Sequence, residues 1–363
     1  AMPDAITLPQ QLRRHGYTCE GYGKIFHNPW PDPRSWDRPH AWGKGSFHHY
    51  TPEQQDLARK VRESHPEDSW HRKHLRGVIT NDPKIDDAEH SEGDLTRLAV
   101  ERLQRLGEAD KPFFLAVGYT LPHLPWTPPE RWWKTYQRES LPLASNPFPP
   151  EGAPAVALGT NYELSHYADM THMPKPAEGS VTDDEARRLR HGYFASVSFI
   201  DAQVGRLLDA LDRFGMVDDT IVILWSDHGY KLGEHNGWSK MTNYEIDTRI
   251  PLIIRDPRAK ANGSRCNRLV ESIDVYPSVC ALTGVPVPDG LDGKSVARLL
   301  NQPTLPHKDA AFSQYIWKPR IGNAIRTDRW RYVEWRDLKS GKIEEQELYD
   351  HRSDPDENRN VVK

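Results

Sequence analysis

An aspartate and a histidine stand side by side where a strongly apolar segment of the chain ends. Residues 220–225 are rich in β-branched side chains and are typical of a central parallel strand, and Asp227, His228 and Gly229 follow them. In open α/β sheets this end of a strand is where functional sites are built. A carboxylate and an imidazole that face one ion form half of a metal site. Spacing alone leaves a second interpretation open, a turn in which the aspartate only caps the backbone.

Four basic side chains elsewhere are further candidates for a functional role. They are Lys24 and His27 in a loop after a short predicted strand, His123 in a proline-rich turn after a predicted buried strand, and Lys240. Cations fixed in a water-poor site stabilise the negative charge that develops when an ester bond breaks. Each residue taken singly also has an ordinary interpretation, as an exposed lysine or as a histidine whose ring is satisfied by the backbone.

Helices and buried strands alternate over residues 1–293, which predicts a three-layer α/β/α sandwich. Helices are expected at residues 7–15, 95–106 and 183–214, and strands at residues 17–23, 112–119, 220–225 and 251–254. Two long segments, residues 28–91 and 141–181, lack a sustained period and are expected to be irregular walls of a pocket, although a surface insertion is an alternative for the first.

The pattern changes after residue 293. A short helix is expected at residues 295–300, followed by alternating segments at 311–316, 323–326 and 330–335 that predict a small antiparallel sheet. We therefore expect two parts, an α/β core domain at residues 1–293 and a C-terminal α+β subdomain at residues 294–363.

Longer motifs around these residues resemble one family. The matching stretches, in chain order, are Gly23-Lys24-Ile25-Phe26-His27, residues 112–125 with Phe-Phe-Leu-Ala-Val-Gly-Tyr and Pro-His-Leu-Pro, residues 193–208, Ser226-Asp227-His228-Gly229 with residues 230–240 and 248–252, residues 324–327, and residues 347–355. The chain resembles the sulfatases of the alkaline-phosphatase-like superfamily, and among them those of the iduronate-2-sulfatase kind. The resemblance spans nearly the whole chain.

The resemblance implies a role for each candidate residue. Asp227 and His228 are expected to bind the metal, which the family implies is Ca²⁺, with Mg²⁺ or another divalent ion as alternatives. Lys24, His27, His123 and Lys240 are expected to surround the sulfate, and His123 or Lys240 to protonate the leaving oxygen. His235 is expected in the same substrate loop, more as a hydrogen-bonding support for Asp227 or Lys240 than as a sulfate ligand. Thr120 stands where related sulfatases often have histidine, which bears on substrate preference.

The nucleophile that the family implies has no counterpart in the sequence. Sulfatases begin with a strand that ends in paired aspartates, followed by a Cys-x-Pro-Ser-Arg or Cys-x-Ala-x-Arg motif whose cysteine becomes formylglycine. The chain has three cysteines, Cys19, Cys266 and Cys280, and none stands in such a motif. We therefore expect an α/β core without its N-terminal strand, a missing segment of the same protein as partner, and a chain that is inactive alone.

Composition narrows the classes of substrate and partner that the protein could bind. The formal net charge of −4 provides no general attraction for nucleic acid, so an acidic substrate must bind to a local basic cluster. No apolar run approaches the ~20 residues of a membrane-spanning helix. No signal sequence is visible, and the resemblance alone implies an extracytoplasmic location, whether periplasmic, secreted or lysosomal.

The leading hypothesis is a sulfuric ester hydrolase that removes sulfate from a sulfated sugar or glycosaminoglycan. One alternative is a catalytically inactive relative that binds sulfate or sulfated glycans. Another is a phosphodiesterase or phosphonate hydrolase of the same superfamily.

Overall fold

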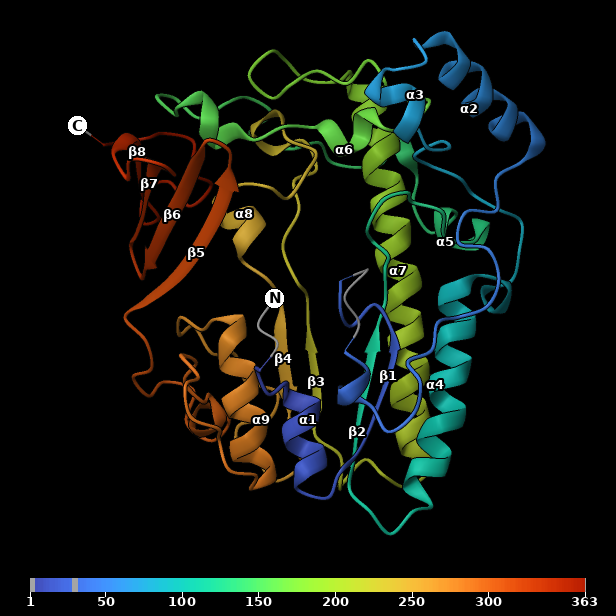
Figure 1. The fold of residues 1–363 in the computed structure, drawn as a ribbon, viewed down its shortest axis with the longest axis vertical. Helices are drawn as coiled ribbons and strands as arrows, with labels where there is room; N and C mark the ends of the chain where they lie inside the picture. Colours follow the sequence, from blue (N-terminus) through green and yellow to red (C-terminus); the bar gives the residue numbers. More distant parts are fainter. Residues whose placement is uncertain (1–3, 28–31, 363) are drawn as a thin grey trace.

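The computed structural model of the protein describes residues 4–27 and 32–362 (Figure 1). Its helices are α1 (Leu8–Arg14), α2 (Pro52–Ser64), α3 (Trp70–His74), α4 (Ser91–Gly107), α5 (Glu130–Trp133), α6 (Tyr162–Ser165), α7 (Asp183–Arg213), α8 (Glu245–Thr248) and α9 (Val275–Thr283). Its strands are β1 (Thr18–Gly23), β2 (Phe113–Gly118), β3 (Val222–Trp225), β4 (Leu252–Arg255), β5 (Ala310–Trp317), β6 (Arg320–Thr327), β7 (Trp330–Asp337) and β8 (Ile343–Asp350).

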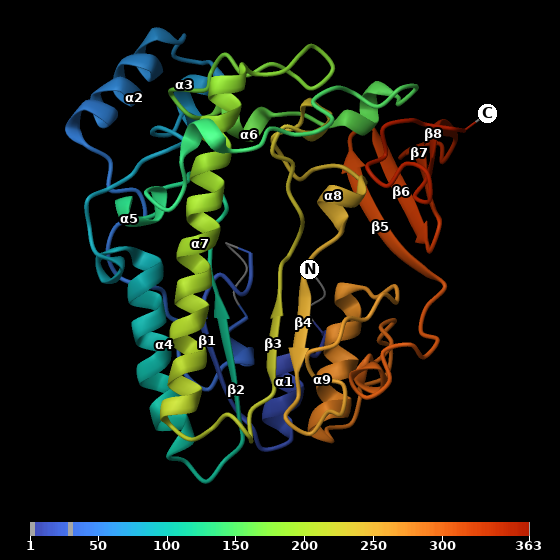
Figure 2. The ribbon, with the colours of Figure 1, turned by 180° about the vertical axis from the view of Figure 1, so that it is seen from behind.

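Alternate residues of β2 face opposite layers of helices. Phe113 and Leu115 pack with the apolar residues of α4 and α7, whereas Phe114 and Ala116 pack with those of α1 and α9. Since side chains of a strand point alternately to its two faces, a strand that is covered on both faces needs an unbroken apolar run. Helices α1 and α9 lie on one side of the strands and α4 and α7 on the other (Figures 1 and 2). The three-layer α/β/α sandwich is confirmed.

The strands of this middle layer form two separate pairs. Strand β1 pairs with β2 in parallel, and β3 pairs with β4 in antiparallel orientation. Residues 220–225 were expected to form a parallel strand. Within the described residues, the one strand that pairs with β3 is β4, and it runs antiparallel, so the expectation is wrong for this pair. One edge of β2 faces one edge of β3 (Figure 1). In the part of the chain that the structure describes, no strand is hydrogen-bonded to either of these two edges. Trp225, at the end of β3, is 46% exposed.

The predicted helix at residues 183–214 is confirmed as α7. Thr182 caps its first turn, where the hydroxyl accepts a hydrogen bond from the amide of Glu185 at 3.3 Å, and three acidic residues in that turn favour the helix dipole. The helix ends at Arg213, and Gly215 follows with φ of 68°, a conformation that glycine adopts without strain.

Regular structure also lies where the sequence predicted none. Helix α2 falls inside the segment expected to be irregular, and it begins with a capping box between Thr51 and Gln54. Its sequence offers little apolar signal, since Leu57, Ala58 and Val61 are its apolar side chains and only Ala58 is buried. The segment expected to form a helix at residues 295–300 is one 3₁₀ turn, Ala297–Leu300.

The C-terminal sheet confirms the predicted antiparallel strands and adds one. Its order is β5-β6-β7-β8. Strand β8 escaped prediction because its first four residues are exposed on the edge of the sheet, and three of them, Glu344, Glu345 and Gln346, are acidic or polar. Among the described residues, no helix is long and apolar enough to cross a membrane.

Candidate active site

Asp227 and His228 lie in the turn directly after β3. The ring Nδ1 of His228 is 2.7 Å from the carbonyl oxygen of Gly229, so Nδ1 donates a proton and Nε2 keeps its lone pair. That Nε2 lies 3.6 Å from Oδ2 of Asp227. Two electron-pair donors facing each other at this distance fit the adjacent ligands of one divalent ion. The donor set therefore suits a divalent ion, and its imidazole favours a softer metal than the Ca²⁺ that the family resemblance implies.

Residues around the turn fix its backbone. The amide of Gly229 donates to the carbonyl of Asp247 at 2.8 Å, and a Cβ atom at residue 229 would lie 2.0 Å from the carbonyl oxygen of Ile246, which only glycine avoids. Asp247 is itself fully buried and pairs with the buried ammonium group of Lys231. Sequence reasoning missed this buried ion pair because Asp247 and Lys231 are far apart in sequence and carry no shared motif.

Lys24 reaches the turn from the end of β1. Gly23 has φ of 72°, and a Cβ atom there would lie 2.1 Å from the carbonyl oxygen of Gly118, so glycine allows β1 and β2 to stay paired up to their ends. The Lys24 ammonium group then lies 3.2 Å from Oδ2 of Asp227. Burial acts to raise the pKa of Asp227, but the nearby His228 and Lys24 lower it overall.

His123 and Lys240 form a second group. The Nζ atom of Lys240 is 3.0 Å from Nε2 of His123 and 2.8 Å from Oε2 of Glu163. Nδ1 of His123 lies 2.8 Å from the carbonyl oxygen of Leu124, so Nδ1 carries the proton and Nε2 accepts one from Lys240. Burial lowers the pKa of His123, and the charges of Lys240 and Lys24 lower it further. The histidine is therefore the neutral partner of a charged lysine.

The other two candidates are placed differently. His27 is exposed in the loop after β1, and no contact within the described ranges links it to Asp227, Lys240 or His123. His235 is 2% exposed, and its Nε2 lies 3.0 Å from the carbonyl oxygen of Asp356 in the C-terminal segment. The structure does not bring His235 to Asp227 or Lys240.

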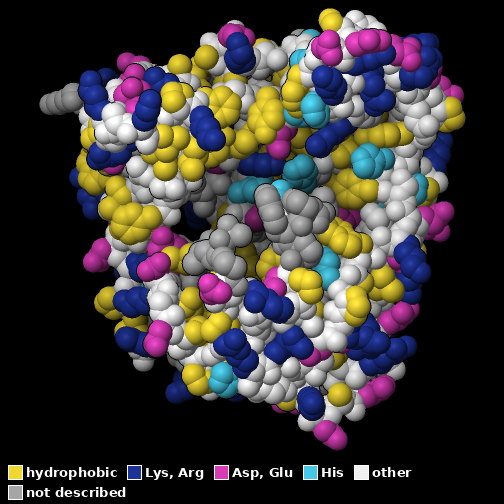
Figure 3. All heavy atoms as spheres, in the orientation of Figure 1, with side chains coloured by type: hydrophobic (Ala, Val, Ile, Leu, Met, Phe, Trp, Pro, Cys, Tyr) yellow, Lys and Arg dark blue, Asp and Glu magenta, His cyan; other side chains and the backbone are white. Residues whose placement is uncertain are grey.

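A cavity of about 650 Å³ opens beside His123. The irregular segment before α4 contributes Trp42, Phe47, His48 and Arg76 to its wall, while Glu92 of α4 and Thr120 lie near His123. Several histidine and basic side chains lie near the centre of this face of the molecule (Figure 3). The segment at residues 28–91 was expected to form a wall of a pocket. The described residues of this segment that line the cavity agree with that expectation.

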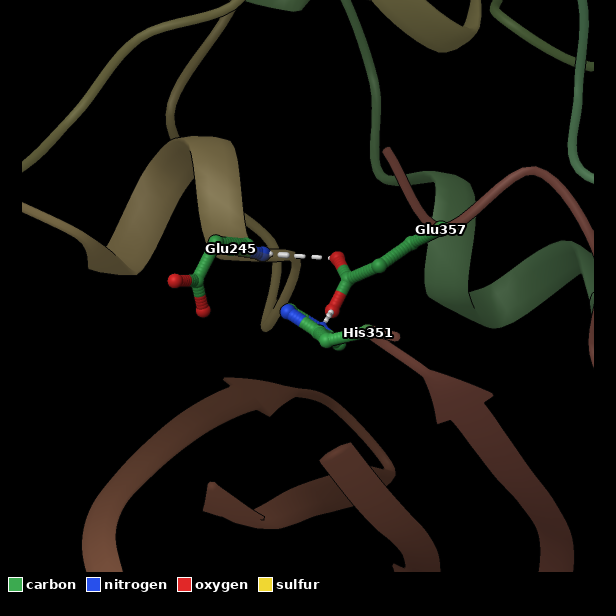
Figure 4. Close-up of side chains that lie close together, drawn as sticks. All are labelled: Glu245, His351 and Glu357. Atoms are coloured by element: carbon green, nitrogen blue, oxygen red, sulfur yellow. Dashed lines mark hydrogen bonds and ion pairs between the residues drawn. The ribbon is translucent and has the colours of Figure 1, made fainter. Parts of the chain in front are cut away.

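A different group of carboxylate and imidazole side chains has close ligand atoms but serves another purpose. Glu245, His351 and Glu357 lie together between α8 and the C-terminal sheet (Figure 4). The Glu357 carboxylate accepts from Nε of Arg331 at 2.6 Å, from Nε2 of His351 at 2.8 Å and from the amide of Glu245 at 2.7 Å. Arg331 also pairs with the Glu245 carboxylate. Two arginines already pair with these carboxylates, Arg331 with both and Arg326 with Glu245 at 3.0 Å, so this group holds the sheet to the core and its carboxylates are not free to bind a cation.

Comparisons with known proteins agree with this arrangement. The family model described as Sulfatase matches residues 2–285, and the model described as N-sulphoglucosamine sulphohydrolase, C-terminal matches residues 233–363. Iduronate 2-sulfatase of Mus musculus is 30% identical over 423 aligned residues, which cover 98% of this chain and 76% of that protein.

Two solved structures share the fold. A protein in complex with its substrate D-glucosamine-2-N,6-O-disulfate has a TM-score of 0.69 and 22% identity, and the match covers 99% of this chain and 78% of that one. Phosphonate monoester hydrolase of Agrobacterium radiobacter has a TM-score of 0.68 and 24% identity, with 98% and 75% covered. The first family model alone matches more than half of the residues, and the chain therefore belongs to the sulfatase family.

Proposed function

We propose that the protein is a sulfuric ester hydrolase of the iduronate-2-sulfatase kind, which removes sulfate from a sulfated sugar or glycosaminoglycan. The observation that carries the proposal is the meeting of Lys24 with Asp227 and His228 at the strand ends, while Lys240 contacts His123 nearby. The similarity to an iduronate 2-sulfatase and the disulfated glucosamine bound by a protein of the same fold support a sulfated sugar as substrate.

The basic residues suit the chemistry of a sulfate ester. Lys24 and Lys240 place two ammonium groups where the three sulfate oxygens would bind, and their charges stabilise the negative charge that grows as the bond to the bridging oxygen breaks. The lowered pKa of His123 keeps its ring neutral, so the transferable proton at this contact resides on Lys240. Lys240 is then the group that protonates the leaving sugar oxygen, and His123 orients it.

Asp227 and His228 would hold the divalent metal, which we propose is Ca²⁺. When bound, the ion supplies Lewis-acid polarisation of the sulfate group. A hard ion such as Ca²⁺ needs further oxygen ligands than this pair provides, and the family pattern places them on aspartates outside these 363 residues.

We further propose that a segment outside these residues supplies the nucleophile, as a formylglycine. The cysteines of the chain cannot take this role. Cys19 and Cys280 are fully buried, and burial raises the pKa of Cys19 to about 12. The thiol of Cys266 donates a hydrogen bond to the carbonyl oxygen of Pro303, away from the cluster. Within the described residues, the facing edges of β2 and β3 are unpaired (Figure 1), and a strand between them would end beside Asp227.

Co-expression tests the proposed segment. The chain is produced alone and together with the upstream coding sequence of its gene, and sulfate release from a sulfated uronic acid glycoside is measured by ion chromatography. We expect turnover only in the second case. Substantial turnover by the chain alone would overturn the proposed segment without affecting the assignment as a sulfatase.

A substrate panel tests the reaction class. The protein produced from its whole gene is given a sulfated sugar, a phosphonate monoester and a phosphodiester, and metal content is measured by mass spectrometry. We expect sulfate release and one divalent ion per chain. Preferred phosphonate or phosphodiester cleavage with two transition-metal ions would instead identify a phosphorus-ester hydrolase, which the shared fold of the phosphonate monoester hydrolase makes the relevant alternative. Sulfated sugar that binds without being cleaved would identify an inactive relative.

We also propose an extracytoplasmic location, which rests on the family resemblance. Fractionation of the source cells, followed by detection of the protein with an antibody, tests it, and a purely cytosolic signal would contradict it.

A further inference from the structure

The cavity beside His123 has a second basic position that the proposed sulfate chemistry does not use. Arg76 lines this cavity together with His123, Trp42 and His48. It lies just after α3, in the Trp- and His-rich segment, whereas His123 lies after β2. A group bound at His123 and a group bound at Arg76 would therefore share one cavity.

The backbone of Arg76 is held firmly. Its amide donates to the carbonyl of His166 at 2.7 Å, and the next residue, Gly77, packs so tightly on the Tyr50 ring that a Cβ atom there would lie 2.1 Å from it. The guanidinium carbon lies 5.9 Å from the centre of the Tyr167 ring, and Nη1 is 3.4 Å from its hydroxyl. The base of the side chain is thus fixed while the residue remains exposed to solvent.

The guanidinium group has no carboxylate partner among the residues that the structure describes. By contrast, Arg188 of α7 is paired with Asp169 at 2.7 Å. The nearest acid whose charge affects Arg76 is Glu163, and its carboxylate lies 2.8 Å from Lys240. The charge of Arg76 acts on its neighbours instead: burial and Arg76 together lower the pKa of His166 to about 4.

An unpaired guanidinium in a cavity is suited to one kind of ligand group. Its planar fork of N–H donors matches the two oxygens of a carboxylate, or two oxygens of a sulfate, in a bidentate contact. Trp42 in the same cavity is 43% exposed and offers a flat apolar surface to a ring between the two anionic groups.

We propose that Arg76 is a specificity-determining residue that binds a second anionic group of the substrate, a carboxylate or a second sulfate on the sugar. The ester sulfate occupies the site of Lys24, Lys240 and His123 at the same time. This inference rests on the proposed function, and it restricts the substrate to doubly anionic sugars. Sugars with one sulfate and no other charge bind weakly.

Three ligands and two variants test this role in the protein produced from its whole gene. The ligands are a sulfated uronic acid glycoside, its carboxyl-reduced counterpart, and the carboxyl-reduced counterpart with a second sulfate. Arg76→Gln removes the charge, and Arg76→Lys keeps the charge but loses the fork. Arg59→Gln is the matched control, because Arg59 is exposed on α2, outside the cavity lining, and pairs only with Asp56 and Glu63.

We expect wild type to prefer a doubly anionic ligand over the reduced monosulfate by about 10- to 100-fold in KM, the range of a charge-assisted hydrogen bond. Arg76→Gln should abolish this preference with little change in kcat, Arg76→Lys should retain part of it, and Arg59→Gln all of it. Whether the carboxylate or the second sulfate restores tight binding identifies the group.

An unchanged preference in Arg76→Gln, with circular dichroism showing a folded protein, would overturn the inference. If wild type releases sulfate from none of the three ligands, the proposed function fails, and calorimetric binding of the same ligands still decides the role of Arg76. Equal affinities of wild type and Arg76→Gln for all three would then refute it.

Discussion

At the residue scale, the turn after β3 presents a carboxylate oxygen and a lone-pair nitrogen that face each other. The proton of His228 is committed to the carbonyl of Gly229, so its Nε2 is available as a ligand. The adjacency of Asp227 and His228 made this pair predictable from sequence. Glu163, which fixes Lys240, was not predictable, because it lies in a segment without periodicity and no local motif marks it.

Replacing Asp227 with Asn tests the metal site. The amide keeps the size of the side chain but loses the negative charge, so we expect divalent-ion affinity and kcat/KM to fall by about 100-fold or more, beyond the effect of outer-shell changes. Metal titration by calorimetry and content by mass spectrometry measure this. Asp209→Asn, on the exposed side of α7, is the control and should leave both unchanged. Full metal content in Asp227→Asn would place the ion elsewhere.

Replacing Lys240 with Gln tests the proton donor. General-acid catalysis contributes typically about 10²- to 10⁴-fold, and its loss is felt most when the leaving group is a poor one. We expect a large fall in kcat on a sugar sulfate and a much smaller fall on a nitrophenyl sulfate, whose leaving oxygen needs no proton. Equal losses on both substrates would show that Lys240 binds sulfate without donating a proton.

At the element scale, short signals in the sequence located most helices and strands, but not the contacts between them. The cap at Thr182 and the glycine at 215 fixed the bounds of α7, and the apolar run of β2 marked a strand covered on both faces. Helix α2 was missed because polar and charged residues make up most of it, and Leu57, Ala58 and Val61 are its apolar side chains. The antiparallel pairing of β3 with β4 depends on the connection between them, which no periodicity reveals.

Glu92 links α4 to the turn before His123 and makes stability depend on pH. Its buried carboxyl accepts from the amides of Thr120 and Leu121 at 2.8 and 3.3 Å, and burial raises its pKa from 4.5 to about 7. The folded state therefore binds the proton more tightly than the unfolded state. Tighter proton binding in the folded state contributes on the order of 3 kcal/mol to the free energy of unfolding. This contribution is fully present below pH 4.5 and is lost as the pH rises through 7.

Glu92→Gln removes this ionisation while keeping an acceptor for the two amides. We expect the variant to gain stability relative to wild type between pH 5 and pH 8, by on the order of 3 kcal/mol. Urea unfolding at several pH values measures the difference. Glu101→Gln on the exposed side of α4 is the matched control. A Glu92→Gln difference that does not change with pH would contradict the role assigned to the buried carboxyl.

Lys231 and Asp247 tie the metal-site turn to α8. Both are buried, so removing one charge leaves the other unpaired, and we expect Lys231→Met to lower the unfolding free energy by about 3–5 kcal/mol. Lys231→Met combined with Asp247→Leu should recover most of this loss. Thermal and urea unfolding provide the values, with Lys260→Met on the surface as control. A loss below about 1 kcal/mol in Lys231→Met would show that the pair is not a buried ion pair in solution.

At the scale of the whole molecule, one apolar core unites strand pairs that do not hydrogen-bond to each other. Residues of β2, β3 and β4 enter the same cluster with α1 and α9, although no described strand pairs with the facing edges of β2 and β3. Sequence patterns predicted the layers but not this division. The C-terminal sheet is bound to the core through Arg331, Glu357 and Glu245, so the predicted division at residues 293 and 294 remains a prediction about folding units.

The most direct measurement of the central claim is sulfate release from a sulfated uronic acid glycoside, followed by ion chromatography, for the protein produced from its whole gene. Wild type, wild type after removal of divalent metal with a chelator, and Lys24→Met are compared. We expect release by wild type and a loss of about 100-fold or more in the other two, since both remove positive charge from the sulfate site. Undiminished release in Lys24→Met and in the chelated enzyme would contradict catalysis at this cluster.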